Sequence, residues 1–191
     1  MKLCVLFPNT NKDADASMVK LFKNMFTMEG WNVITEKYSG YDDPGKLLRQ
    51  FNTNLKSSIN DKDTTAVLFI GIGYGAFWAY QVARLHGEAA ALVNPIMDPT
   101  QVLKLDMFNQ TKYQEMMYAS SLPVQTMSLL TRDTIVGNTD ELTLFEIGSM
   151  VKLLGSDCTD MMLAHHIESF SEDVTTNNSE TFGVYNGKNS N

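Results

Sequence analysis

The chain has 191 residues, of which 43% are hydrophobic and 19% charged, enough to bury one core and too few for two ordinary domains. Its formal net charge of −7 makes it an acidic protein, which counts against a nucleic-acid or anionic-membrane surface because phosphate binding needs clustered Lys and Arg. We therefore expect one compact domain whose partners are neither nucleic acids nor membranes.

Strands and helices are expected to alternate along the chain. In chain order we expect a strand at residues 3–7, a helix capped by Asp13 or Asp15 and closed by Gly30, a strand at 31–38, a helix that opens at Pro44, a strand at 66–70, a helix at 76–86, a strand at 89–93, a mostly helical excursion at about 99–120, a strand at 124–130, a helix at 142–154 and a last short strand at 158–164. This order predicts an α/β fold, a three-layer α/β/α sandwich with a mainly parallel sheet and a small helical cap.

The domain is expected to cover residues 1–175, with the cap at about 98–121. Residues 176–191 are expected to form a flexible C-terminal tail, because Ser, Thr, Asn and Gly dominate that segment. Cys4 and Cys158 fall in apolar segments without metal-ligand spacing, which predicts buried, reduced thiols. The opening apolar run ends at Pro8 and does not have the form of a signal peptide, so we expect a cytoplasmic location.

A glycine-rich turn joins the third predicted strand to a helix. It has the sequence Gly-Ile-Gly-Tyr-Gly-Ala over residues 71–76. In α/β-hydrolases the same strand–turn–helix junction carries the pattern G-x-S-x-G, whose serine is the nucleophile. Gly73 holds the serine position here, so acyl transfer by the usual covalent route is not expected.

Polar residues follow several predicted strands at their carboxyl ends, which is where open parallel sheets bind ligands. Asn9 and Thr10 follow the first strand, Asn94 the fourth, Asp133 the fifth and His166 the last. An acid and then a histidine downstream of the glycine turn repeat the hydrolase order of nucleophile, acid and base.

These motifs resemble those of small bacterial α/β-hydrolase-fold proteins of the YqiA/YcfP type, which are described as esterases. The matching segments are Gly-Ile-Gly-Tyr-Gly-Ala-Phe-Trp-Ala at 71–79, Leu-Val-Asn-Pro at 92–95, Leu-Leu-Thr-Arg-Asp at 129–133, and His166, within a resemblance that spans about residues 1–175. The resemblance implies an α/β-hydrolase-like fold, with the acid at Asp133, the base at His166 and Gly73 in place of the nucleophile. The first loop of the family usually offers His-Gly to the oxyanion site, whereas this chain has Pro8 and Asn9, and Pro8 has no N–H to donate.

We therefore expect a pseudoenzyme, a catalytically degenerate protein that binds a small molecule or a protein partner in the cleft at the strand ends. The expected ligand-binding residues are Asn9, Thr10, Gly73, Tyr74 and Asn94. Glycine accepts a strained elbow backbone at little cost, so losing the serine exchanges chemistry for stability. No cofactor or metal is expected, because His165 and His166 lack the spacing of a helical zinc site. A homodimer fits this interpretation.

Two other functions stay open. His166, oriented by Asp133, could activate water directly in an esterase-like hydrolase, with His165 on the opposite side of an extended chain. Residues 71–76 also match the dinucleotide fingerprint G-x-G-x-x-G/A, which would make this a nucleotide-binding protein. Against that function, the turn follows the third strand, and the next strand ends in Asn94 where an acid is expected.

Overall fold

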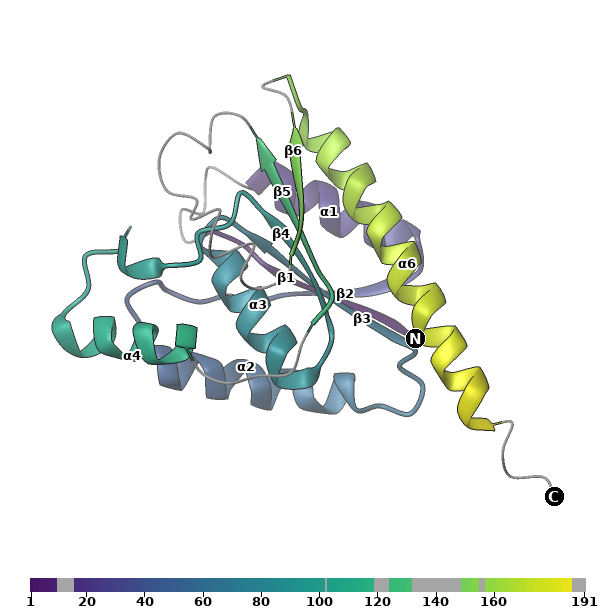
Figure 1. The fold of residues 1–191 in the computed structure, drawn as a ribbon, viewed down its shortest axis with the longest axis horizontal. Helices are drawn as coiled ribbons and strands as arrows, with labels where there is room; N and C mark the ends of the chain where they lie inside the picture. Colours follow the sequence, from purple (N-terminus) through teal and green to yellow (C-terminus); the bar gives the residue numbers. More distant parts are fainter. Residues whose placement is uncertain (10–15, 102, 119–123, 132–148, 155–156, 187–191) are drawn as a thin grey trace.

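A parallel β-sheet forms the centre of the computed structural model, which describes residues 1–9, 16–101, 103–118, 124–131, 149–154 and 157–186 (Figure 1). Within these residues the sheet has six strands in the order β2-β1-β3-β4-β5-β6, and each neighbouring pair is parallel. The strands are β1 (Lys2–Phe7), β2 (Trp31–Thr35), β3 (Ala66–Ile72), β4 (Ala89–Val93), β5 (Thr126–Thr131) and β6 (Met150–Leu154). All carboxyl ends therefore meet at one edge.

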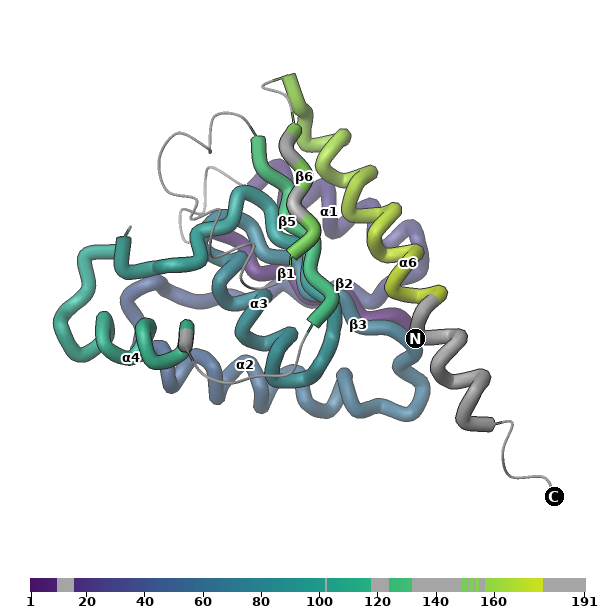
Figure 2. The backbone as a smooth tube through the Cα atoms, viewed as in Figure 1, coloured from purple at the N-terminus to yellow at the C-terminus, as the bar shows by residue number. Residues whose placement is uncertain are grey.

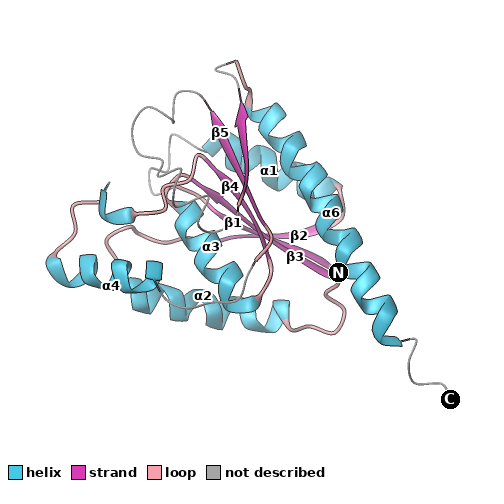
Figure 3. Ribbon diagram, in the orientation of Figure 1, coloured by secondary structure: helices cyan, strands magenta, loops and turns pink. Residues whose placement is uncertain are grey.

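Helices cover both faces of the sheet (Figure 3). On one face lie α2 (Pro44–Ile59) and α3 (Gly75–His86), and on the other lie α1 (Ala16–Met28) and α6 (Asp160–Asn186). Every residue of β3 and β4 is buried, as a central strand covered on both faces requires. The predicted three-layer α/β/α sandwich is confirmed.

The segment between β4 and β5 forms the small helical cap. It contains a 3₁₀ turn, η1 (Pro99–Gln101), and the helix α4 (Met107–Tyr118), which lies beside α2 (Figure 2). Asp106 caps α4 by accepting a hydrogen bond from the Asn109 N–H at 2.8 Å. The predicted helical excursion is therefore confirmed over the part that the structure describes.

Two predicted elements near the C-terminus are wrong. Residues 158–164 do not form a strand, because α6 begins at Asp160, and residues 150–154 form β6 rather than the end of a helix. The rest of that predicted helix, 142–148, lies outside the described residues. A short apolar run such as Met150–Leu154 fits a strand or a helix equally well, and pairing with β5 decides between them.

The sequence of α6 contains an N-cap residue and apolar residues at helical spacing. These two features outweigh the short apolar segment that suggested a strand at 158–164. The Thr159 hydroxyl accepts a hydrogen bond from the Met162 N–H at 3.4 Å, as an N-cap residue does. Its buried side chains recur at helical spacing, namely Leu163, Ala164, Ile167, Phe170 and Val174. The helix continues to Asn186, so part of the predicted tail is helical, and its flexibility stays a prediction.

The two cysteines lie in different surroundings. Cys4 is a buried free thiol, and burial raises its pKa, whereas Cys158 is a half-buried free thiol in the loop before α6.

In the part of the chain covered by the structure, no helix combines the length and apolarity needed to cross a membrane.

The first prediction concerns Gly75, where α3 begins against the carboxyl end of β1. A Cβ added at Gly75 would lie 2.0 Å from the Phe7 carbonyl oxygen and 2.7 Å from the Pro8 carbonyl oxygen. Because these are backbone atoms, Gly75→Ala is expected to lower the free energy of unfolding by about 1–3 kcal/mol in urea denaturation. Gly45→Ala in α2 is the matched control, with an expected change below about 1 kcal/mol. Equal stability of the two variants would contradict the tight β1–α3 approach.

The second prediction concerns His86, the last residue of α3, whose ring stacks on Phe69 at 6.5 Å between centroids. Burial lowers the pKa of His86 below its ordinary value, and the positive charge of Lys56 lowers it further. The neutral ring therefore adds stability that is complete above about pH 6.5, the unfolded pKa, and is lost as the pH falls through the folded pKa. A proton NMR titration should find the His86 ring titrating below pH 6.5, and His86→Gln should lose less stability than wild type between pH 7.5 and 5.5. Titration of His86 above pH 6.5 would contradict this account.

Candidate functional site

The turn between β3 and α3 has the backbone conformation of a sharp elbow. Gly73 has a φ of +56°, in the left-handed region that favours glycine. Its N–H donates to the Val93 carbonyl at 2.9 Å, and its own carbonyl accepts from the Ala76 N–H at 3.1 Å and the Ile96 N–H at 3.0 Å. These bonds hold the turn to the end of β4 on one side and to the start of α3 on the other.

The side chain of Asn9 fills the space directly beside Gly73. A Cβ added at Gly73 would lie 2.8 Å from Asn9 Nδ2 and 3.0 Å from Asn9 Cγ, closer than ordinary van der Waals contact. Asn9 follows β1, whose carboxyl end lies next to that of β3 in the sheet. The position where a side chain would project from the elbow is therefore occupied by an amide group from the neighbouring strand end.

Asn94 joins the ends of β4 and β5. Its φ of +45° is unusual for a residue other than glycine. The Asn94 side-chain oxygen accepts hydrogen bonds from the Thr131 N–H at 2.9 Å and the Thr131 hydroxyl at 3.3 Å, and the Asn94 N–H donates to the Leu129 carbonyl at 2.9 Å. Its amide oxygen thus has a structural role, and its predicted contact with a ligand stays a prediction.

Tyr74 turns away from the strand ends into the core. Its side chain is 1% exposed, and its hydroxyl forms a hydrogen bond with the Tyr113 hydroxyl from α4. Burial raises the pKa of Tyr74, and the neighbouring Tyr113 raises it further, so the phenol is neutral at any physiological pH. Tyr38 lies on the same side of the sheet and donates a hydrogen bond to the Pro8 carbonyl.

The predicted acid and base are not both described. Asp133, like Thr10, lies outside the described residues, so the pairing of Asp133 with His166 stays a prediction. His166 is half-buried in the second turn of α6 rather than at a strand end. Because both histidines lie on one helix, His165 projects about 100° from His166 and not to the opposite side. The Nδ1 atom of His165 lies 3.1 Å from the Glu168 carboxylate.

Sequence reasoning missed two residues at this edge. The first is Asn9 in its steric role, which no pattern indicates because the contact with Gly73 joins distant segments. The second is Glu36, which follows β2 and donates its backbone N–H to the Leu6 carbonyl at 2.9 Å. The Glu36 side chain is 6% exposed, and burial raises its pKa. The sequence carries no signal that would separate this buried glutamate from a surface one.

Metal ligands do not gather at this edge in the described structure. Over the residues with assigned positions, no group of three His, Cys, Asp or Glu side chains lies close enough to hold a metal ion. Of the polar side chains described at this edge, that of Asn9 lies beside Gly73, and Glu36 follows the neighbouring strand β2. Gly73 has no side chain, and the Tyr74 hydroxyl of the same turn is paired with the Tyr113 hydroxyl in the core.

Three solved structures share this fold at low sequence identity. Est1E from Butyrivibrio proteoclasticus aligns with a TM-score of 0.71 and 10% identity, over 92% of this chain and 88% of that chain. A structure from work on carboxylesterases of the thaumarchaeon Nitrososphaera gargenis gives 0.59 and 11%, over 92% of each chain. A protein from Xanthomonas campestris pv. campestris, assigned to the alpha/beta hydrolase superfamily, gives 0.52 and 14%, over 87% and 98% of the two chains.

Sequence comparison places the chain in a family without assigning it an activity. No curated protein matches its sequence. Residues 20–144, which include the elbow, Asn94 and α4, match the uncharacterised protein family UPF0227. The chain therefore belongs to the uncharacterised protein family UPF0227, on a fold that it shares with α/β-hydrolase esterases.

Proposed function

We propose that this protein is a catalytically degenerate relative of the α/β-hydrolase esterases, of the YqiA/YcfP type, that binds a ligand at the carboxyl edge of its sheet. Gly73 stands where an esterase of this fold carries its nucleophilic serine. The ligand is a small molecule or a protein partner, and it is not a nucleic acid. The observation that carries the proposal is the contact between Gly73 and the Asn9 side chain.

Two features of the elbow argue against a nucleophile at position 73. Gly73 has no side chain, so the elbow offers no oxygen to attack an ester. Asn9 fills the space into which a serine Cβ would project, with its Nδ2 atom 2.8 Å from that point. A serine restored at this position would have to displace the Asn9 side chain and adopt the positive φ of Gly73.

The same contact counts against the nucleotide alternative. A dinucleotide fingerprint works because glycine lets a pyrophosphate approach the helix N-terminus closely. Beside Gly73 that approach is taken by the Asn9 side chain. A ligand at this edge would instead meet the amide of Asn9 and the neighbouring strand ends.

The solved structures that share this fold indicate which reaction we propose this protein no longer performs, namely ester hydrolysis. Est1E and the Nitrososphaera gargenis carboxylesterases are named as esterases. A shared fold does not by itself fix an activity, so the residues of the site have to carry the assignment. Retained recognition without turnover is the function that this combination supports.

The third prediction tests the proposal by covalent labelling with a fluorophosphonate probe and by hydrolysis of short p-nitrophenyl esters. Wild type and Gly73→Ser are both expected to show no stoichiometric labelling and no burst, because Asn9 excludes the added side chain. The double variant Asn9→Gly, Gly73→Ser removes this obstruction, and with His166 as the base that the hydrolase order predicts it is expected to become labelled at residue 73. Gly45→Ser, on the surface helix α2, controls for labelling of an arbitrary serine.

Two outcomes would overturn the proposal. Stoichiometric labelling of wild type, at any residue, would show a working nucleophile. Labelling of Gly73→Ser as fast as that of the double variant would show that Asn9 does not close the elbow. Intact-mass spectrometry with peptide mapping reads out both.

A further inference from the structure

Helix α4 packs on the rest of the protein through one fully buried side chain, with Met116 and Met117 partly buried against the same core cluster. Among its residues 107–117, for which side-chain burial is described, Tyr113 is the buried one, at 0% exposed. At the opposite extreme, Met107 is 82% and Phe108 63% exposed. A helix with one buried and two partly buried apolar side chains is held less firmly than the core helices, and such elements open locally at lower free energy than the core.

Tyr113 enters a slot whose walls are aromatic. The ring centroid of Tyr113 lies 5.4 Å from that of Phe77, 5.9 Å from that of Trp78 and 6.5 Å from that of Tyr74. The hydroxyl of Tyr113 forms a hydrogen bond with the Tyr74 hydroxyl. The slot therefore fits one flat ring that carries one hydroxyl group, and Tyr74, its polar wall, is the residue next to Gly73.

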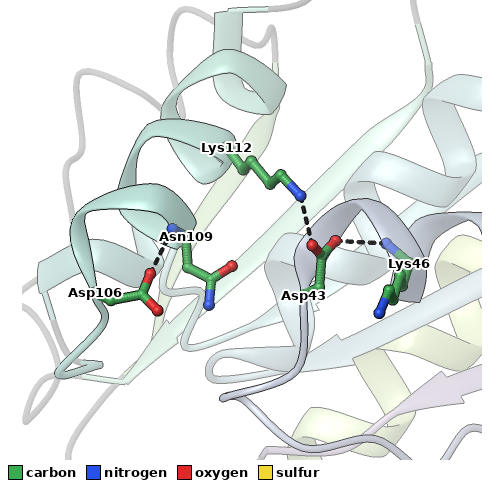
Figure 4. Close-up of polar contacts among 5 residues, drawn as sticks. All are labelled: Asp43, Lys46, Asp106, Asn109 and Lys112. Carbon is green, nitrogen blue, oxygen red and sulfur yellow. Dashed lines mark hydrogen bonds and ion pairs between the residues drawn. The ribbon is translucent and has the colours of Figure 1, made fainter.

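The residue before Tyr113 provides a second attachment. Lys112 forms an ion pair with Asp43, the N-cap residue of α2, which also accepts a hydrogen bond from the Lys46 N–H at 2.9 Å (Figure 4). The side chains of Lys112 and Asp43 are 28% and 22% exposed, so solvent and salt reach the pair. Partly exposed ion pairs of this kind contribute little, and salt weakens them.

We propose that Tyr113 is a removable plug, and that the slot it leaves when α4 undocks is a binding site for a small phenol or aromatic alcohol. This inference rests on the proposed function, because it names the ligand class for a site that begins at Tyr74, the residue next to Gly73. The plug shows the chemistry that the slot accepts, namely a planar apolar body and one neutral hydroxyl. The hydroxyl of the ligand replaces that of Tyr113 as the partner of Tyr74.

The charge of the slot selects a neutral ligand. Burial raises the pKa of Tyr113 to about 12 and also raises that of Tyr74, so both phenols keep their protons. The rings around it belong to Tyr74, Phe77 and Trp78 and carry no charge, while the carboxylates of Asp42 and Asp43 also disfavour an anion there. A phenolate or a carboxylate would lose its hydration there without gaining a cation.

Binding to the undocked state has a specific effect on the position of α4 and on the apparent affinity of the ligand. A ligand that takes the slot competes with Tyr113, so it raises the population in which α4 is undocked. Its apparent affinity is the intrinsic affinity reduced by the undocked fraction, and a variant that loosens α4 binds more tightly. A ligand bound on the surface of the docked state would not couple to α4 in this direction.

The test is hydrogen exchange of the wild-type protein with p-cresol as the probe, and toluene as the analogue without a hydroxyl. p-Cresol is expected to speed amide exchange in α4 in a concentration-dependent way, while exchange in β3 and β4 stays unchanged, and toluene is expected to act more weakly. Lys112→Met is expected to lower the apparent p-cresol Kd several-fold, and Lys104→Met, outside α4, serves as the matched control. Tyr113→Ala is expected to bind p-cresol and to gain thermal stability from it.

Slower or unchanged α4 exchange in the presence of p-cresol would overturn the inference, and so would equal p-cresol affinities of the two lysine variants. Because wild type and the lysine variants carry the test, it holds even where Tyr113→Ala does not fold. A negative result here leaves the labelling test of the elbow untouched. The failure of the ligand class and the failure of the proposed function can therefore be distinguished.

Discussion

The carboxyl end of β1 lies directly against the turn between β3 and α3, and the rest of the site depends on this contact. The carbonyl oxygens of Phe7 and Pro8 leave no space for a Cβ at Gly75. One residue later in the β1 loop, Asn9 takes the space beside Gly73. The same close approach thus packs the helix onto the sheet and fills the space beside Gly73, the position that we propose an esterase of this fold would give to its nucleophile.

The remaining groups around the elbow are largely committed to holding the structure. Asn94 uses its amide oxygen to join β4 to β5, and Tyr74 uses its hydroxyl to meet Tyr113 of α4. A polar group with an internal partner costs less to bury and stiffens its surroundings. Asn94 and Tyr74 therefore hold the strand ends, the turn and α4 together. The binding that we propose therefore relies on strand-end groups such as Asn9 and on the undocking of α4.

The sequence predicted most of the fold because its central elements carry strong local signals. The apolar runs that became β1, β3, β4 and β5 are bounded by clear turn residues, and the glycine pattern at 71–76 placed the elbow correctly. The prediction failed after residue 150, where residues 150–154 and 158–164 are short segments in which apolar residues alone do not separate a strand from a helix. There the sheet neighbour and the Thr159 cap decide the structure, and only the cap is a local signal.

The site was less predictable than the fold, for a physical reason. Glycine at position 73 is visible in the sequence, but the contact of Asn9 with it depends on how two strand ends meet in space. The burial of Glu36 and the pairing of Tyr74 with Tyr113 have the same origin. Long-range contacts of single side chains leave no periodic pattern, so they follow from the assembled sheet and not from any one segment.

The most direct measurement of the central claim is a double-mutant cycle on the free energy of unfolding, with Gly73→Ala, Asn9→Ala and the double variant. If Asn9 closes the elbow, Gly73→Ala costs more in the wild-type background than beside Asn9→Ala, where only the strain of a positive φ remains. The expected coupling between the two sites is at least about 0.5 kcal/mol. Additive effects, within about 0.3 kcal/mol, would contradict the contact and with it the account of a closed nucleophile position.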